Sequence, residues 1–197
     1  MDYMNNNSRD WTVLFIGGAS GTGKSTLAYE LGKFYGVNVL EVDDIGQALK
    51  ATTTKDILPA IHYGENWLDL GVEENIKWLI NVSKEIIPGI KAIVDRHIVD
   101  KLPVIIEGDF IYPELTVSFA NPKIKSIFLI ERDKNQIINN YLAREGGDLQ
   151  NYRADICIGY GDWLKNECAK LEIKAIESRP WTNLMERVID NVRAVGN

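Results

Sequence analysis

The feature that most constrains the fold of this chain is one short glycine-rich segment. Residues 18–25 read Gly-Ala-Ser-Gly-Thr-Gly-Lys-Ser and fit the spacing G-x-x-x-x-G-K-[ST]. A β-like apolar run, residues 12–16, precedes the segment, and a helical pattern that includes Leu27 and Leu31 follows it. A strand, this loop and a helix in that order predict a phosphate-binding loop at the carboxyl edge of a parallel α/β sheet.

The residue types of the motif match the chemistry of binding phosphate. Small residues let backbone N–H groups approach the phosphates, Lys24 reaches the β and γ oxygens, and Ser25 offers its hydroxyl to Mg²⁺. The alternative is a glycine-rich turn whose lysine is merely solvated, but motif and context together favour a nucleoside triphosphate site. We expect the nucleotide to contact Gly18, Ala19, Ser20, Gly21, Thr22, Gly23, Lys24, Ser25 and Thr26.

Further β-like runs alternate with helical patterns along the chain. They cover residues 37–42, 103–107, 124–130 and 173–176, so we predict five parallel strands in a doubly wound α/β sheet. No repeat or linker divides residues 11–197, which predicts a single domain. Residues 1–10 are polar and rich in Asn, and we expect them to form a flexible arm.

Two inserts are expected in this sheet. About sixty residues separate the second and third strands, more than a simple crossover needs, and residues 76–98 carry apolar side chains at helical spacing. We predict a helical cap over residues 52–101, kinked or divided at Pro88-Gly89. A second polar insert, residues 142–154, contains Gly146-Gly147 and is expected to hinge as a lid.

Composition excludes several classes of protein. The longest apolar runs fall far short of the roughly eighteen residues that span a bilayer, and the start resembles no signal peptide, so we expect a cytoplasmic protein without a membrane segment. The 22 basic and 28 acidic residues give a net charge of −6, which disfavours duplex nucleic acid as a partner. Cys157 and Cys168 have no nearby His and are interpreted as core thiols.

The other motifs of the sequence and its length indicate which class of P-loop protein it belongs to. The sequence has no N-K-x-D motif, which GTPases use for base recognition, and the 197 residues are short for a ring-forming ATPase. A sheet with a cap and a lid is typical of a small kinase that encloses donor and acceptor away from water. The oligomeric state is not predicted by these patterns.

Two acidic residues are expected where the second strand ends. Asp43 borders the ligand crevice, so it could orient an acceptor hydroxyl and accept its proton. Asp44 lies three residues before Gln47, a spacing that fits a capping box, so an N-cap role competes with contact to the acceptor substrate.

The third strand ends in Ile-Glu-Gly-Asp. Glu107 follows a run of apolar residues, where a P-loop protein commonly places the group that holds the Mg²⁺ shell. Asp109 lies two residues on and would point to the same side of an extended segment. It could share the metal site or contact the acceptor, or Gly108-Asp109 could simply begin a turn toward Pro113.

Several cations and aromatic residues are candidates for the remaining contacts. Arg144 stands beside the predicted hinge and could balance charge during transfer, or be a solvated helix-end arginine. Arg179 with Trp181 could form a wall for the adenine base, or Trp181 could be a structural anchor. Arg132 and Arg153 are alternative cations near the lid. His62, Tyr63 and Trp67 could line the acceptor pocket, whereas His97 is expected to be a core or surface residue.

Residues 17–26, 39–43 and 105–108 together resemble the P-loop kinases grouped with 2-phosphoglycerate kinase. The resemblance implies a fold like that of nucleoside monophosphate kinases, a strand order of 2-3-1-4-5, and ATP with Mg²⁺ as cofactors. It also implies transfer of phosphate to a hydroxyl of a small-molecule acceptor. An arginine that the family carries near the start of the helix after the second strand has no counterpart at Ile45 or Gly46.

Two other functions fit the same patterns. A regulatory or interaction module could close its cap on a nucleotide without productive transfer. A kinase acting on the 5′ ends of nucleic acids is the third interpretation, and the acidic balance of the chain disfavours it.

Overall fold

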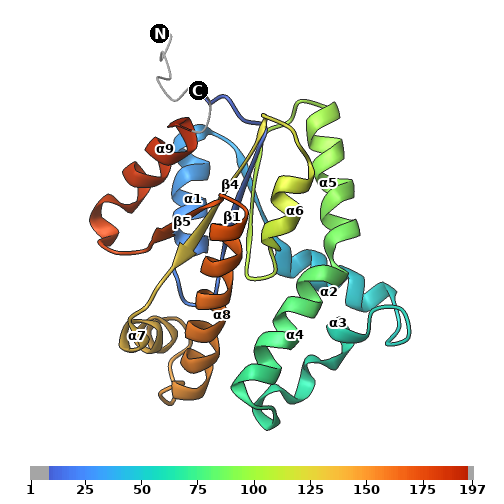
Figure 1. Ribbon diagram of the computed structural model, residues 1–197, viewed down its shortest axis with the longest axis vertical. Helices are drawn as coiled ribbons and strands as arrows, with labels where there is room; N and C mark the ends of the chain where they lie inside the picture. Colours follow the sequence, from blue (N-terminus) through green and yellow to red (C-terminus); the bar gives the residue numbers. More distant parts are fainter. Residues whose placement is uncertain (1–8, 195–197) are drawn as a thin grey trace.

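The computed structural model describes residues 9–194, so the expected arm lies almost wholly outside the described residues. Within this range, five strands form one parallel sheet in the order β2-β3-β1-β4-β5 (Figure 1). The predicted strand number, direction and order are therefore confirmed. The strands are β1 Val13–Gly18, β2 Asn38–Glu41, β3 Val104–Gly108, β4 Ile124–Ile130 and β5 Lys174–Glu177.

Helices connect these strands and cover both faces of the sheet. In the described part of the chain they are α1 Lys24–Tyr35, α2 Val42–Thr52, α3 Pro59–Tyr63, α4 Val72–Glu85, α5 Ile87–Val99, α6 Pro113–Ser118, α7 Lys134–Glu145, α8 Asn151–Lys170 and α9 Leu184–Ala194, with 3-10 helices η1 Gly64–Asp69 and η2 Trp181–Asn183. Within residues 9–194, no helix is both long and apolar enough to cross a membrane.

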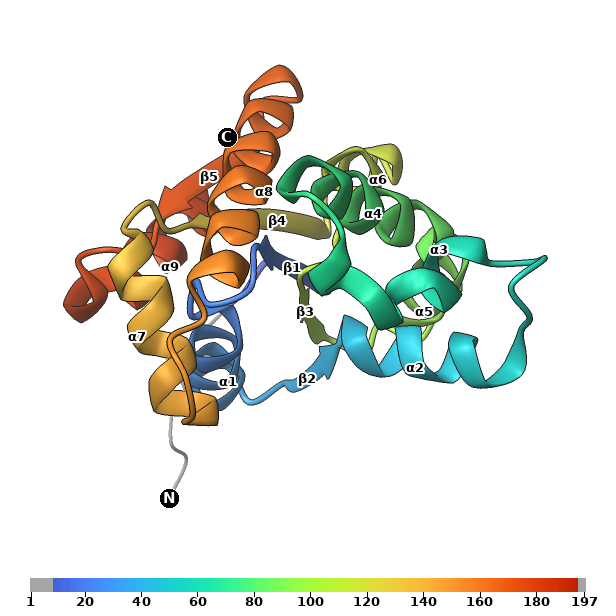
Figure 2. The same ribbon diagram turned by 90° about the horizontal axis from the view of Figure 1, so that it is seen from below.

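Alternating side chains of the central strand divide the core into two layers. Leu14 and Ile16 of β1 pack with buried residues of α1 and α9 on one face of the sheet. Val13 and Phe15 point to the opposite face and pack with residues of α5, α6 and α8 (Figure 2). Strands buried on both faces are nearly continuous in apolar residues, which is why the sequence pattern identified them.

The ends of α1 follow from its glycines. Gly23 precedes the helix with φ 89° and Gly36 ends it with φ 65°, both in the left-handed region that favours glycine. The predicted start near Gly23 and stop at Gly36 are confirmed. The helix therefore begins directly at the end of the phosphate loop, which points its free N–H groups toward a ligand.

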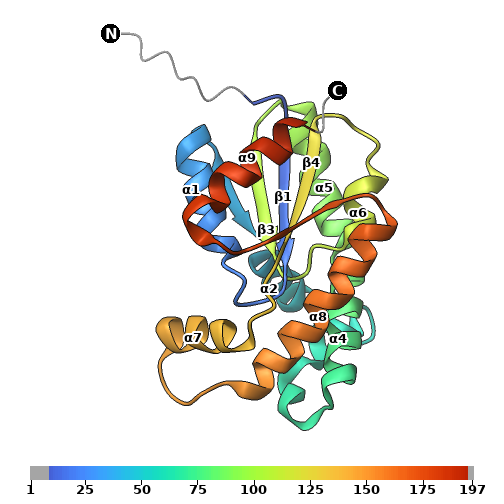
Figure 3. The same ribbon diagram turned by 60° about the vertical axis from the view of Figure 1, so that its left-hand side comes forward.

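The predicted cap divides into two parts. The chain breaks at Ile86 between α4 and α5, two residues before the Pro88-Gly89 pair that indicated a division. Helix α4 packs on α8 beyond the strand ends, whereas Ile90 and Val94 of α5 are buried against the sheet. Of residues 52–101, the part that ends with α4 thus lies beyond the strand ends, and α5 is the crossover helix beside the sheet (Figure 3).

The second strand is shorter than its apolar pattern predicts. It ends at Glu41, and α2 begins at once with Val42, so the expected strand over residues 37–42 is too long at both ends. Val42 is fully buried beneath Gly108, where an added Cβ would lie 2.7 Å from its side chain. The apolar character of Val42 thus reflects packing against β3 rather than strand structure.

Candidate active site

The phosphate loop is shaped by glycines and by its own hydrogen bonds. Gly21 and Gly23 have φ of 78° and 89°, and the Thr22 hydroxyl donates to the Ala19 carbonyl oxygen at 2.9 Å. A Cβ at Gly23 would lie 2.4 Å from the Trp181 ring. Glycine is required there for two reasons, the backbone conformation and the contact with that ring.

Residues from two distant segments hold the loop in place. The Asn140 side-chain amide of α7 donates to the Gly21 carbonyl oxygen at 2.7 Å. The Ser178 hydroxyl, after β5, donates to the Thr22 carbonyl oxygen at 2.8 Å. Gln136 in turn donates to Asn140 at 2.6 Å. Because a trans peptide places its N–H opposite its carbonyl group, the N–H groups of Thr22 and Gly23 point away from these two contacts.

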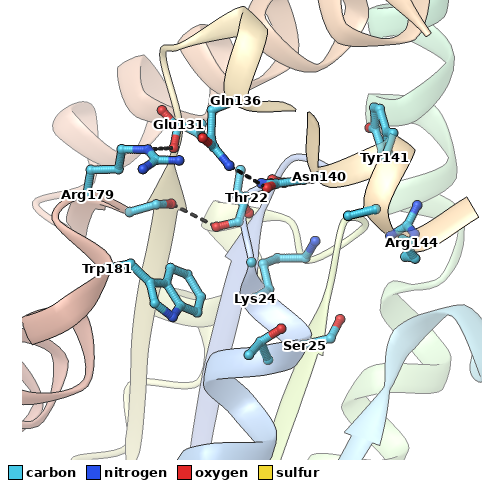
Figure 4. A pocket seen from close by; sticks show the side chains of 15 residues that line it. Thr22, Lys24, Ser25, Glu131, Gln136, Asn140, Tyr141, Arg144, Arg179 and Trp181 are labelled. Atoms are coloured by element: carbon cyan, nitrogen blue, oxygen red, sulfur yellow. Dashed lines mark hydrogen bonds and ion pairs between the residues drawn. The ribbon is translucent and has the colours of Figure 1, made fainter. Parts of the chain in front are cut away.

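A cavity of about 650 Å³ opens beside this loop. Figure 4 shows Arg179 and Trp181 on one side of it and Tyr141 and Arg144 on the other, with Lys24 between them. Its size and its position at a helix N-terminus suit a nucleotide.

One wall of the cavity is fixed by an ion pair. Arg179 Nε donates to Glu131 Oε2 at 3.1 Å, and Glu131 is only 8% exposed. The other oxygen of Glu131 accepts backbone N–H bonds from Arg132 and Asp133 at 2.9 and 3.0 Å. Arg179 and Trp181 therefore stand where the adenine wall was predicted, although the role itself stays a prediction.

Lys24 is the buried cation of the site. Its side chain is 6% exposed, forms an ion pair with Asp109, and also donates to the Ala19 carbonyl oxygen at 3.3 Å. Burial by itself would lower the pKa of the Lys24 ammonium. The charge of Asp109, followed by those of Glu107 and Asp43, outweighs burial and raises this pKa. Lys24 therefore stays protonated at neutral pH.

The acidic residues around Lys24 are themselves perturbed. Burial, followed by the charge of Asp109, raises the pKa of Asp43, and Lys24 acts in the opposite direction. Burial also raises the pKa of Glu107, while Lys24 and a hydrogen bond from Ser25 lower it. Asp43, Glu107 and Asp109 therefore lie near Lys24, as the sequence predicted from their places at two strand ends.

These side chains suit Mg²⁺ only together with a phosphate ligand. Among the described residues, no three His, Cys, Asp or Glu side chains converge closely enough to hold a metal. Mg²⁺ in kinases is typically bound by one or two protein oxygens, waters and phosphate oxygens. Ser25 with Glu107 supplies such a small donor set, so the residues present fit the ion.

The capping role predicted for Asp44 is wrong. Helix α2 begins at Val42, its N-cap residue is Glu41, and no side chain caps it, which places Asp43 and Asp44 in its first turn. The strand ends one residue earlier than expected, so the register of a capping box with Gln47 is lost. Both carboxylates instead stabilise the helix through its dipole, and contact of Asp44 with the acceptor stays a prediction.

The predicted lid residues lie at the junction of α7 and α8. Gly146 and Gly147 have φ of 68° and 76°, and such positive values favour glycine. Glu145 forms ion pairs with Arg144 on one side and Arg153 on the other. A hydrogen bond from Gln150, followed by one from Arg144, lowers the pKa of Glu145 to about 2. Hinge motion of this segment stays a prediction.

The arginines near the lid occupy different places. Arg144 lines the nucleotide-sized cavity. The Arg153 guanidinium stacks on the Tyr141 ring, 4.1 Å from its centroid, and lines a second cavity. Arg132 instead pairs with Glu177 at the surface, at 3.0 Å, and lines neither.

The second cavity has a volume of about 330 Å³ and lies under the cap. Ser20, of the phosphate loop, and Asp109 border it, and so does Trp67, whose contact with an acceptor stays a prediction. His62 does not line it: the residue is held in α3 near Thr53, with 3.3 Å between His62 Nε2 and Thr53 Oγ1. Tyr63 borders a different cavity on the outer side of α4.

Sequence reasoning missed several residues of both cavities. Gln136, Asn140 and Tyr141 gave no motif, although polar residues four apart on a helix are a signal for one shared face. Asn75 is 1% exposed within an apolar helical pattern, and this contrast could have identified it. The remaining side chains of the second cavity are apolar or aromatic, and in the sequence they are typical of a hydrophobic core. They are Trp78, Leu79, Phe110, Ile156, Cys157 and Tyr160. Cys157 and Cys168 are buried and free, as predicted.

The chain is similar in sequence to archaeal proteins named 2-phosphoglycerate kinase. It is 31% identical over 109 residues to the protein of Methanocaldococcus jannaschii, a match that covers 52% of this chain and 35% of that protein. The match to Pyrococcus horikoshii is 24% identical over 192 residues and covers 91% and 64%. The chain thus spans little more than a third of the first of these relatives. No protein-family profile matches it.

Solved structures of kinases share the fold. A shikimate kinase from Acinetobacter baumannii has a TM-score of 0.55 at 13% identity, over 94% of each chain. A gluconokinase from Sinorhizobium meliloti has a TM-score of 0.54 at 13% identity, over 94% of this chain and 93% of that one. With its sheet order and phosphate loop, this chain has the fold of P-loop small-molecule kinases.

Proposed function

We propose that the protein is an ATP-dependent phosphotransferase that acts on a hydroxyl of a small metabolite. One observation carries the proposal: two cavities border the phosphate loop, and an ion pair joins a residue of one to a residue of the other. Lys24 lines the larger cavity, Asp109 lines the smaller one, and the two side chains are bonded to each other. A donor and an acceptor in these cavities would face one another across the loop.

The chain's own residues supply each part of such a transfer. The loop's N–H groups and Lys24 would hold the β- and γ-phosphates, and Arg144 would offset charge on the far side. Asp43 would accept the proton of the acceptor hydroxyl. At the same time the hydroxyl oxygen of the acceptor would attack the γ-phosphorus, and the bond from that phosphorus to the β-phosphate oxygen would break. Mg²⁺, when held by Ser25 and Glu107, would neutralise charge on the β- and γ-phosphates.

The relatives support this reaction type. The sequence matches are to proteins named 2-phosphoglycerate kinase, and the structural neighbours include a gluconokinase and a shikimate kinase. Each of these names describes phosphorylation of a small hydroxylated acid. The resemblance of fold and phosphate loop supports ATP as the donor here as well.

Acceptor-dependent release of ADP tests the proposal. The purified chain is incubated with Mg²⁺ and ATP, alone and with sugar acids, cyclic alcohols, nucleosides or 2-phosphoglycerate. We expect at least one acceptor to raise ADP release well above the rate with ATP alone, and Lys24→Ala to abolish the increase. ATP binding without stimulation by any acceptor would favour a regulatory module, and no ATP binding at millimolar concentration would reject both functions.

A further inference from the structure

We infer that the acceptor is a hydroxylated ring compound that carries a single carboxylate. The inference rests on the proposed function and concerns the 330 Å³ cavity under the cap, called here the acceptor cavity. Its lining includes the aromatic residues Trp67, Trp78, Phe110 and Tyr160 and the charged residues Asp109 and Arg153. Two properties of this lining carry the argument, its aromatic faces and its one cation.

Two of the aromatic side chains, Trp78 and Tyr160, present apolar surface to the cavity because their polar atoms are already engaged. Trp78 Nε1 donates to the Ala60 carbonyl oxygen at 2.8 Å, and the Tyr160 hydroxyl donates to the Asp109 carbonyl oxygen at 2.9 Å. Phe110 packs against Trp78 edge to face, with 6.3 Å between ring centroids. Such surfaces match the face of a ring better than a short, fully charged chain.

Arg153 is the one cation among the residues that line the acceptor cavity. Its hydrogen bonds to described residues all start from Nη1, two to Glu145 and one to Gln150, each at 3.0 Å. The Nε and Nη2 donors have no partner among the described residues. These two donors form one edge of the guanidinium, and that edge suits the two oxygens of a carboxylate.

The charge balance of the cavity favours one carboxylate over a phosphate ester. Glu145 already offsets part of the charge of Arg153, and its pKa of about 2 keeps it ionised at neutral pH. Asp109 adds a negative charge to the lining of the cavity. An acceptor with two or three negative charges would meet one partly neutralised arginine and one carboxylate, so its extra charge would lack a partner.

Binding measurements test the inference without relying on transfer. The protein, saturated with a nonhydrolysable ATP analogue and Mg²⁺, is titrated with four probes, and tryptophan fluorescence and thermal shift are recorded. Quinate and 4-hydroxycyclohexanecarboxylate represent the inferred class, myo-inositol lacks the carboxylate, and 2-phosphoglycerate lacks the ring and carries more charge. We expect the two ring carboxylates to bind at least about tenfold more tightly than the other two probes.

Two variants assign the selectivity to Arg153. Arg153→Gln should remove the preference for ring carboxylates over myo-inositol, Arg153→Lys should restore only part of it, and affinity for the ATP analogue should change less than about twofold. Arg96→Gln, at an exposed arginine of α5, is the matched control and should behave as the parent protein.

The outcomes separate this inference from the proposed function. If 2-phosphoglycerate or myo-inositol binds as tightly as the ring carboxylates, or Arg153→Gln leaves the preference intact, the inference is overturned even when transfer to some acceptor is observed. If the ring carboxylates bind selectively through Arg153 while no acceptor stimulates ADP release, the inference stands and the proposed reaction fails.

Discussion

The Lys24 ammonium and the Asp109 carboxylate form an ion pair between the two cavities of the site. Lys24 is 6% exposed and Asp109 is 23% exposed, so the pair is largely shielded from water. A nucleotide phosphate must therefore compete with Asp109 for the lysine.

Replacing Asp109 should change the need for Mg²⁺. In Asp109→Asn, one of the negative charges that face a bound γ-phosphate is lost, and Lys24 no longer has to leave a carboxylate. We expect ATP in the absence of Mg²⁺ to bind about tenfold more tightly, a gain of about 1.4 kcal/mol. Calorimetric titration in EDTA measures this, with Asp95→Asn on the exposed side of α5 as control. Unchanged or weaker Mg²⁺-free binding would contradict this account of the pair.

Replacing Asp43 should lower turnover far more than replacing Asp44, although the two residues are neighbours in the first turn of α2. Asp43 is the one whose carboxyl is coupled to Lys24 and Asp109. We expect Asp43→Asn to lower turnover by roughly 10²- to 10⁴-fold with ATP affinity nearly unchanged. Asp44→Asn should cost only about 0.5 kcal/mol of stability through the helix dipole. The reverse order of rate effects, in folded variants, would make Asp44 the base.

The buried carboxyl of Glu107 should make stability depend on pH. The pKa of Glu107 is higher in the folded protein than in the unfolded chain, so the unfolded chain ionises more easily. Ionisation therefore lowers the stability of the fold once the pH rises above the pKa of a glutamate in the unfolded chain. The cost is absent at low pH and fully present at neutral pH. Glu107→Gln should therefore stabilise the nucleotide-free protein by about 1 kcal/mol at pH 8, a typical gain where function strains a site.

Denaturation curves at pH 8 and pH 4.5 measure this effect. The gain from Glu107→Gln should shrink as the pH falls, because the parent carboxyl is then protonated as well. Glu30→Gln, at an exposed position of α1, should show no such trend. A loss of stability at pH 8, or a gain independent of pH, is the result that would refute the sign of the shift.

Glu145 should weaken the attraction that Arg144 and Arg153 exert on anionic ligands. It is shared by Arg144 of the nucleotide-sized cavity and Arg153 of the acceptor cavity. Glu145→Gln frees both guanidinium groups, so we expect anionic probes to bind about three- to tenfold more tightly at low salt, and 2-phosphoglycerate to gain most. Titrations at two ionic strengths check this. Equal gains for neutral myo-inositol would show a structural rather than an electrostatic effect.

The fold could be predicted because its signals are local and repeated. Apolar runs identified the strands that are buried on both faces, and Gly23 and Gly36 marked the ends of α1. The break between α4 and α5 was likewise visible at Pro88. In each case one physical property, burial or a backbone constraint, acts on neighbouring residues and leaves a pattern in the sequence.

The parts of the site that depend on packing between distant segments could not be predicted. The sequence near Val42 carries no signal that α2 begins there, because the burial of Val42 depends on its packing against Gly108 of β3. Asn140 and Ser178 reach the phosphate loop from segments more than a hundred residues away. His62 was expected in the acceptor pocket from its place in the cap, but the turn of α3 directs it to Thr53.

Transfer of the γ-phosphate itself is the most direct test of the central claim. The protein is incubated with Mg²⁺, ATP labelled at the γ position with ³²P, and a mixture of small hydroxylated acids, and the labelled products are separated. We expect label on an acid in the parent protein and in Lys33→Met, at an exposed lysine of α1, and none in folded Lys24→Met. Label that appears only as inorganic phosphate, or transfer that survives in Lys24→Met, would contradict the central claim.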